Sequence, residues 1–168
     1  DGHLFLDVTG TVRLFGPPPD VAWRLRRQAR RELGLKPAWA VAPNKLVAKV
    51  ATRLVKPDGE SIVPAGEERR FLASVPLHLV PGIESQDLLR LADFNFRRAG
   101  QVAALGLHAL QVPFGRRALD LYETVQGIDR SPVRPVDQRP PRLIRDHAFE
   151  EGVQAVPVVE GALYALVE

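Results

Sequence analysis

Residues 44–59, with the sequence NKLVAKVATRLVKPDG, decide the fold of this chain. Asn44 is a favourable N-cap, and the spacing of apolar residues predicts a helix from Lys45 to about Val55. At 100° per residue one side of this helix is apolar, with Leu46, Val47, Val50, Ala51 and Leu54. The triplet Pro57-Asp58-Gly59 then forces a turn. The stretch therefore predicts an amphipathic helix that ends abruptly.

The polar side of the same helix contains Lys45, Lys49 and Thr52, and Lys56 continues its line. The chain has 23 Lys and Arg residues, of which only four are lysines, so a line with three lysines is unusual here. We call Lys45, Lys49 and Lys56 the lysine stripe. Two interpretations stay open, a surface that contacts phosphate groups and an ordinary solvated face.

The sequence before this helix predicts two strands with a helix between them. Residues 3–9 (HLFLDVT) and 38–42 (AWAVA) are rich in strand-forming residues, and Pro43 ends the second run. Asp20 is the expected cap of a helix over 21–33 that stops at Gly34. Its expected buried stripe consists of Val21, Leu25, Ala29 and Leu33, and Trp23 and Trp39 are expected in the core. Together with a strand at 61–63, this order predicts a layered arrangement of helices on a sheet.

The sequence after this strand predicts mainly helices. Residues 66–73 have a helical pattern, and from Pro76 onward three helical pieces follow, at 84–93, 98–105 and 114–126, with no convincing strand. The proline-rich segment 127–141 is typical of a linker. Residues 142–149 then predict a strand, and a helix is expected from about Pro157. The fold class predicted for the whole chain is α+β.

Composition and charge exclude several classes of protein. No apolar run approaches the roughly 18 residues that a membrane span needs, so we expect no membrane partner and a cytoplasmic protein without a secretory leader. Cys is absent, which excludes disulfides and thiolate metal sites, and the four His residues (His3, His78, His108 and His147) show no metal-ligand spacing. Met is absent too, so we expect a piece of a longer protein. Residues 1–72 have 13 basic against 8 acidic residues, so a polyanion would be met there.

Three stretches in this order resemble the Y-family (DinB/UmuC-like) lesion-bypass DNA polymerases. They are FLDVTG at 5–10, NKLVAKVA at 44–51 followed by KPDG at 56–59, and LVPGI at 79–83. The second matches the family signature NKxxAKxA…KPxG in residue type and spacing and is the specific one. The resemblance extends from Leu4 to about Pro135. It implies a partial palm over 1–72, a helix-hairpin-helix thumb over 73–130, and a linker with the start of a little-finger domain over 131–168.

The resemblance also implies site residues. In active members, lysines matching Lys49 and Lys56 meet the triphosphate of the incoming nucleotide, so the lysine stripe is a candidate phosphate site. Gly82 and Ile83 of the hairpin turn, with Arg97 and Arg98, are candidate contacts to the DNA backbone.

The chain departs from the family at its catalytic acids. Aligning residues 5–7 with the family strand places Gly2 and His3 where an Asp and a Glu should hold metal ions. Glycine provides no ligand, and a neutral imidazole is a poor ligand for Mg²⁺. Asp7 lies roughly 13–17 Å further along a strand and cannot replace them. We therefore expect no catalytic residue, no metal and no cofactor at this site.

This pattern resembles the ImuB-type members, which are inactive relatives that act as scaffolds in bacterial induced mutagenesis. The resemblance implies primer–template DNA, the sliding clamp, a RecA-like accessory protein and an error-prone C-family polymerase as partners. Two alternatives stay open. One is an active translesion polymerase, which would require Mg²⁺, and the other is a protein-interaction module without DNA binding.

Overall fold

The computed structural model describes residues 3–135, 147–149, 152 and 155–167 of the chain. They belong to two compact units, Asp1–Val133 and Arg134–Glu168. The first unit contains the sheet and most of the helices. The domain boundaries predicted at 72/73 and 130/131 stay predictions.

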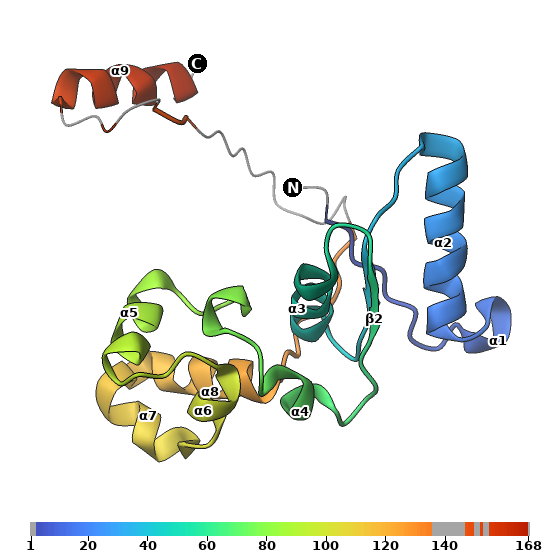
Figure 1. Ribbon diagram of the computed structural model, residues 1–168, viewed down its shortest axis with the longest axis horizontal. Helices are drawn as coiled ribbons and strands as arrows, with labels where there is room; N and C mark the ends of the chain where they lie inside the picture. The colour runs from blue at the N-terminus through green and yellow to red at the C-terminus, as the bar shows by residue number, and fades with distance from the viewer. Residues whose placement is uncertain (1–2, 136–146, 150–151, 153–154, 168) are drawn as a thin grey trace. The chain divides into compact units, whose positions relative to one another are not determined.

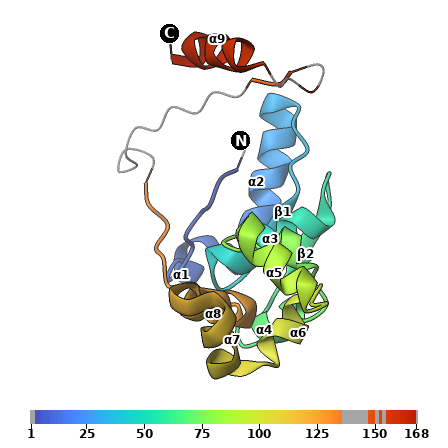
Figure 2. The same cartoon turned by 90° about the vertical axis from the view of Figure 1, so that its left-hand side faces the viewer.

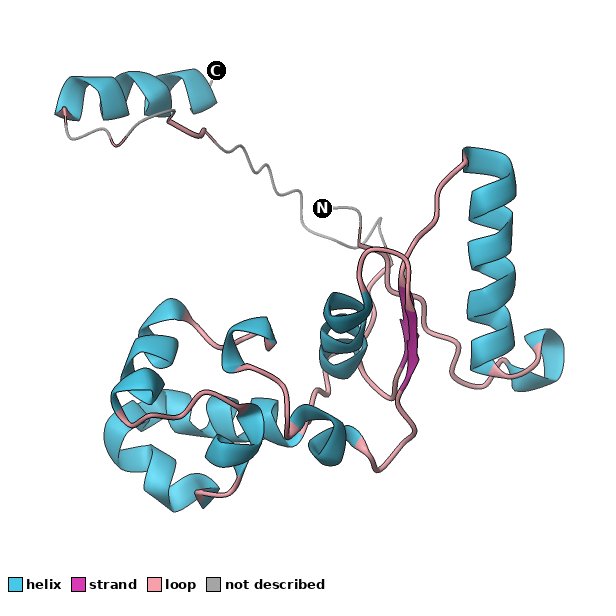
Figure 3. Cartoon of the chain, in the orientation of Figure 1, coloured by secondary structure: helices cyan, strands magenta, loops and turns pink. Residues whose placement is uncertain are grey.

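A two-stranded parallel sheet lies between two helices in the first unit (Figures 1 and 3). Strand β1 (Trp39–Val41) pairs with β2 (Glu60–Ile62) in the register Trp39↔Glu60 and Val41↔Ile62. Helix α3 (Lys45–Val55) connects the two strands and packs on one face, and α2 (Pro18–Leu33) packs on β1 from the other side. The α+β class is confirmed, and the described sheet is a parallel pair.

Helix α3 follows the predicted pattern because its cap and its apolar side are both local features. Leu46, Val47, Val50 and Ala51 are buried in the core as expected. Leu54 is 45% exposed, so the predicted apolar side ends one turn earlier. The buried side faces the small sheet, which fixes the lysine stripe on the opposite face.

The predictions for residues 3–33 are partly wrong. Residues 3–8 form no strand, and Leu4 and Leu6 are 80% and 57% exposed, because no described strand accepts their backbone hydrogen bonds. A short helix, α1 (Val12–Phe15), follows. Helix α2 ends at Gly34 as predicted but begins at Pro18, since proline is favourable in a first helical turn.

The predicted buried stripe of α2 is only half-covered. Leu25 and Leu33 are 46% and 68% exposed, and no residue of α2 is buried. A helix of 16 residues is about 24 Å long, far longer than a sheet of two three-residue strands can cover. Trp23 lies on the other side of α2 from this stripe, is 51% exposed and lies outside the core, whereas Trp39 is half-buried.

The remaining elements of the first unit are helical, as predicted. In chain order they are α4 (Glu68–Leu72), η1 (Leu77–Leu79), α5 (Ser85–Asp93), α6 (Ala99–Ala103), α7 (Gly106–Phe114), η2 (Gly115–Arg117) and α8 (Ala118–Gln126). Figure 1 shows α5 to α8 gathered in one group, which lies toward the viewer in Figure 2, and α6 and α7 pack on α8. The predicted helix over 114–126 starts later, at Ala118, and α7 was not predicted.

The second unit contains helix α9 (Val156–Val167), which confirms the helix expected from about Pro157. The strand predicted at 142–149 falls largely outside the described residues, which include only 147–149 of it, without regular structure. Residues 128–135, within the predicted linker, form neither helix nor strand. None of the described helices has the length and apolar content needed to cross a membrane.

Candidate nucleic-acid interface

The first turn of α3 is held by the segment that follows α8. Asn44 Oδ1 accepts a hydrogen bond from the Val47 N–H at 2.9 Å, which is the predicted N-cap. The Asn44 amide donates to the Gly127 carbonyl at 2.7 Å, and the Leu46 N–H donates to Asp129 Oδ2 at 3.1 Å. Asn44 and Leu46 therefore join two segments that are more than 80 residues apart in sequence.

Lys45 takes part in the same junction and does not point to a free phosphate site. Its ammonium donates to the Pro132 carbonyl at 2.8 Å. Burial disfavours the charged form of Asp129, but hydrogen bonds from Ser131 and Leu46 N–H, with the charge of Lys45, outweigh it and lower the pKa of Asp129. An ionised carboxylate at the start of α3 also interacts favourably with the helix dipole.

The other two lysines of the stripe lie near His3, which the family resemblance assigns to the position of a catalytic acid. Burial and the positive charges of Lys56, Lys49 and Arg53 together lower the pKa of His3. The charges of Lys49, Lys56 and Arg53 thus act at His3, and we call these four residues the cationic cluster. Gly2 lies outside the described residues.

The residues of this cluster do not fit a divalent metal ion. Nearby cations repel a metal, and His3 provides at most one nitrogen ligand where Mg²⁺ prefers oxygen. Asp7 is exposed, and hydrogen bonds from Thr9 lower its pKa, so this carboxylate is directed to its own turn. Nowhere in the described part of the chain do three His, Asp or Glu side chains gather in a way that could hold a metal.

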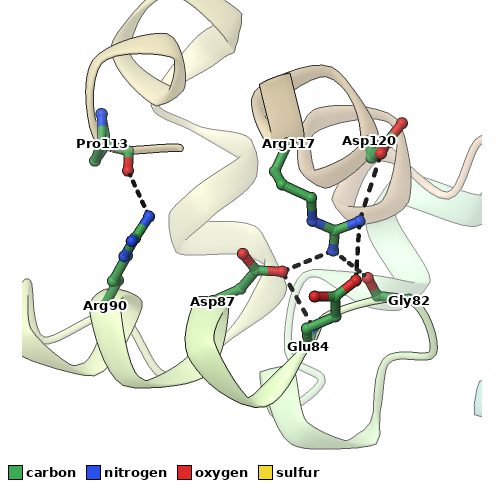
Figure 4. A network of polar contacts seen from close by, with 7 residues as sticks. All are labelled: Gly82, Glu84, Asp87, Arg90, Pro113, Arg117 and Asp120. Carbon is green, nitrogen blue, oxygen red and sulfur yellow. Dashed lines mark hydrogen bonds and ion pairs between the residues drawn. The ribbon is translucent and has the colours of Figure 1, made fainter. Parts of the chain in front are cut away.

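The predicted hairpin turn is attached to α3 and is fixed by a network of charged side chains. Arg53 donates from its guanidinium to the Leu79 carbonyl at 2.7 Å, directly before the turn. Arg117 donates to Gly82 O at 2.9 Å and to Asp87 Oδ2 at 2.7 Å (Figure 4). Asp87 is buried and also accepts from the Glu84 N–H at 3.1 Å. Both ends of the turn are thereby held in place.

The Asp87 hydrogen bond raises the pKa of Arg117, although burial acts against it, and Glu84 and Asp120 add favourable charge at 3.4 Å each. The turn itself offers hydrogen-bond donors. Within the described residues, no carbonyl or side chain accepts from the N–H groups of Gly82 and Ile83, and Gly82 is exposed with φ of +88°. Two free N–H groups in succession are suited to a phosphate oxygen.

Arg97 and Arg98 hold α6 to the segment around residue 75. The guanidinium of Arg98 donates to the Ser74 carbonyl, and the N–H groups of both arginines donate to Gln101 Oε1 at 2.9 Å. The Arg97 carbonyl accepts from the Leu77 N–H at 3.0 Å. Arg98 therefore has a structural partner, while the Arg97 side chain is exposed.

Sequence reasoning did not single out Arg53 or Asp87; it gave Arg117, with Arg116, as a plausible phosphate contact, and Asp129 only as part of the family resemblance at 127–129. One pattern could have revealed Asp87, because an acid three residues after the helix-capping Glu84 closes a capping box. The partners that join Arg53, Arg117 and Asp129 to other segments (Leu79, Asp87 and Leu46) lie more than 25 residues away, so no local pattern predicts these contacts.

The comparisons with known proteins agree on one family. Residues 1–53 match the model of the impB/mucB/samB family. The chain is 33% identical over 167 residues to DNA polymerase IV of Caulobacter vibrioides, covering 99% of this chain and 41% of that protein. It is 37% identical over 133 residues to DNA polymerase IV of Halorhodospira halophila, covering 79% and 37%.

Solved structures give the same result. An insertion ternary complex of Dbh DNA polymerase matches with a TM-score of 0.61 and 25% identity, covering 76% of this chain and 38% of that one. A DinB family error prone DNA polymerase from Sulfolobus solfataricus matches with the same score and identity, covering 76% and 39%. The chain thus spans about two fifths of the length of these relatives.

Proposed function

Because this chain belongs to the Y family of DNA polymerases, we propose that it is a catalytically inactive member that acts as a DNA-associated scaffold in translesion synthesis and induced mutagenesis. The proposal rests on the alignment with the family strand, which assigns Gly2 and His3 to the positions of the two catalytic acids, and on the positive charges of Lys49, Lys56 and Arg53 that act at His3. Nucleotidyl transfer needs carboxylates to hold two metal ions, and the cluster repels them.

Without the two catalytic carboxylates, the proposed surface is more positively charged than in an active polymerase, so it attracts phosphate groups more strongly. Among the residues that the structure describes, Lys49, Lys56 and Arg53 form no ion pair with a carboxylate, so their positive charge stays available to a phosphate. The N–H groups of Gly82 and Ile83, which have no acceptor among the described residues, supply a second point for the DNA backbone, and Arg53 links the lysines to this turn through the Leu79 carbonyl. Both features support binding of DNA by backbone contacts, which position a duplex without reading its sequence.

The partners proposed beyond DNA rest on the ImuB-type resemblance. They are the sliding clamp, a RecA-like accessory protein and an error-prone C-family polymerase. In this proposal the chain contributes the DNA-contacting part of the scaffold, since all its candidate contacts are to phosphate. We propose a cytoplasmic location, as for its DNA partner.

The alternative is an active translesion polymerase. It is favoured by the names of the curated relatives, which are called DNA polymerase IV at 33% and 37% identity. It requires metal-binding carboxylates in place of Gly2 and His3, so the two functions differ in metal affinity.

The DNA association is tested by fluorescence anisotropy with a labelled primer–template at several salt concentrations. We expect binding that weakens steeply with salt, and a slope about 1.8 shallower for Lys49→Gln/Lys56→Gln, at about 0.9 per phosphate contact. The matched control is Lys36→Gln/Arg69→Gln, which removes two exposed charges away from the cluster. Absence of binding by the unchanged chain at low salt would refute a DNA-associated function and leave a protein-interaction module.

A further inference from the structure

Helix α2 presents a row of arginines on the side that faces away from the sheet. Arg24, Arg27 and Arg31 line a shallow hollow together with Gln28. At 100° per residue, these three arginines fall within about 60° of one another around the helix axis. Leu25, Ala29 and Leu33 lie on the opposite half, so anything that covers the apolar stripe leaves the arginine row exposed.

The hollow also has an aromatic side chain at its edge. The guanidinium of Arg27 lies 4.7 Å from the centre of the Trp23 ring, and Trp23 is 51% exposed. Among the described residues, nothing accepts a hydrogen bond from the Arg27 side chain or forms an ion pair with it. An arginine stacked on an exposed tryptophan is held in position with its hydrogen-bond donors still available.

The charge of this helix is strongly positive. Helix α2 contains five arginines against Asp20 and Glu32. Glu32 pairs with Arg31 at 3.0 Å and accepts from Gln28 at 3.1 Å, and Arg24 donates to the carbonyls of Asp20 and Phe15. These neighbours neutralise only part of the arginine charge. Positive charge therefore remains along about 10 Å of the helix, from Arg24 to Arg31.

We propose that the outer face of α2, formed by Trp23, Arg24, Arg27 and Arg31, is a second DNA contact that binds the phosphate backbone of single-stranded DNA. This inference rests on the proposed DNA-associated function and adds a site that neither the lysine stripe nor the hairpin turn provides. Arginine forks suit phosphates, and an exposed tryptophan is the group on which an unpaired base stacks. An acidic peptide would bind the arginines but has no base to stack on the tryptophan. The presence of arginines and an exposed tryptophan on the same face therefore favours single-stranded DNA as the ligand.

The test uses the full chain and a fluorescent oligothymidine strand, with affinity measured between about 50 and 200 mM salt. For Arg27→Gln/Arg31→Gln we expect a salt slope about 1.4 shallower than for the unchanged chain, at about 0.7 per phosphate on a single strand. Arg69→Gln/Arg70→Gln removes the same charge from exposed positions on α4 and is expected to keep the original slope.

A spectroscopic measurement tests the aromatic part separately. Trp39→Phe leaves Trp23 as the one tryptophan, and the Trp39 Nε1 has no hydrogen-bond partner to lose. We expect oligothymidine to quench the remaining fluorescence and an acidic peptide of equal charge to leave it unchanged.

The outcomes separate this inference from the proposed function. If the chain binds DNA but Arg27→Gln/Arg31→Gln behaves like the α4 control, the α2 site is refuted and DNA association stands. If the acidic peptide competes as strongly as the oligonucleotide, the face binds protein and the inference is equally refuted. If the unchanged chain binds no DNA at low salt, both proposals fail together.

Discussion

Arg117 illustrates how one side chain fixes a candidate DNA contact without touching DNA. It lies between the turn at Gly82 and the helix that starts at Ala118, and it compensates the buried carboxylate of Asp87. A buried carboxylate without its partner is costly, so the turn and the helix are coupled through this residue. An arginine pair at 116–117 would otherwise suggest two exposed phosphate contacts.

We predict that Arg117→Gln lowers the free energy of unfolding by about 2 kcal/mol, because Asp87 loses its charge partner while staying buried. Urea denaturation of the chain measures this change. Arg116→Gln is the control, since Arg116 is exposed, and should change stability by less than about 0.5 kcal/mol. Equal effects of the two substitutions would contradict the structural role of Arg117.

A second prediction concerns His3. His3→Glu places a carboxylate near Lys49, Lys56 and Arg53, so it should neutralise part of the cationic cluster and weaken binding of primer–template DNA at low salt. His3→Gln, which keeps a neutral side chain, serves as the control. Anisotropy titrations compare the two, and tighter binding by His3→Glu would show that the cluster does not meet DNA.

At the scale of elements, two glycines with the same backbone angle differ in their surroundings. Gly127 ends α8 and Gly106 begins α7, and both have φ of +76°. A Cβ on Gly127 would lie 2.7 Å from the Glu68 Cβ, whereas one on Gly106 meets nothing within 4 Å. Only Gly127 is therefore required by close packing, here of α8 against α4.

Gly106→Ala should cost about 1 kcal/mol of stability from backbone strain alone, and Gly127→Ala about 3 kcal/mol from strain and steric overlap. Thermal or urea unfolding of the two variants checks the difference. Indistinguishable stabilities would mean that α4 moves away from α8 without cost.

The junction at the start of α3 predicts a dependence of stability on pH. The pKa of Asp129 is lower in the folded chain than its ordinary value of 3.8, so the unfolded chain binds the proton more readily. The stabilisation is present above pH 3.8 and disappears as the pH falls through the lower folded value.

Asp129→Asn should lower the free energy of unfolding by about 1 kcal/mol at neutral pH, and this free energy should then decrease less steeply in acid than for the unchanged chain. Asp93→Asn, at an exposed position, is the control. A decline in acid as steep as that of the unchanged chain would contradict this role.

At the scale of the whole molecule, local patterns predicted the elements and missed their long-range partners. The helix from Lys45 was predictable because its cap and apolar side lie within 12 residues. Residues 3–8 were not, since a strand depends on a neighbour that the local sequence does not specify. Helix α7 escaped because Pro113, within its last turn, is a helix-breaking signal.

At the candidate site, too, local patterns were predictable and long-range contacts were not. The lysine stripe was predictable from helical periodicity, yet one of its members, Lys45, donates to a carbonyl 87 residues away. The charge of α2 was visible in the sequence, and helical periodicity places Trp23 on the arginine side, about 140° from the apolar stripe, where it is 51% exposed beside Arg27. Which charged residues face a ligand and which hold the fold is decided by tertiary contacts.

The central claim, that this family member has lost the metal site of its polymerase relatives, is tested most directly by Mn²⁺ binding. Electron paramagnetic resonance measures the concentration of free Mn²⁺ while the ion is titrated into the unchanged chain and into the variant Gly2→Asp/His3→Glu. We predict no specific binding to the unchanged chain and a new Mn²⁺ site in the variant, because two carboxylates return to the positions of the acids. Specific binding of Mn²⁺ by the unchanged chain, equal to that of the variant, would contradict the account and restore the active-polymerase alternative.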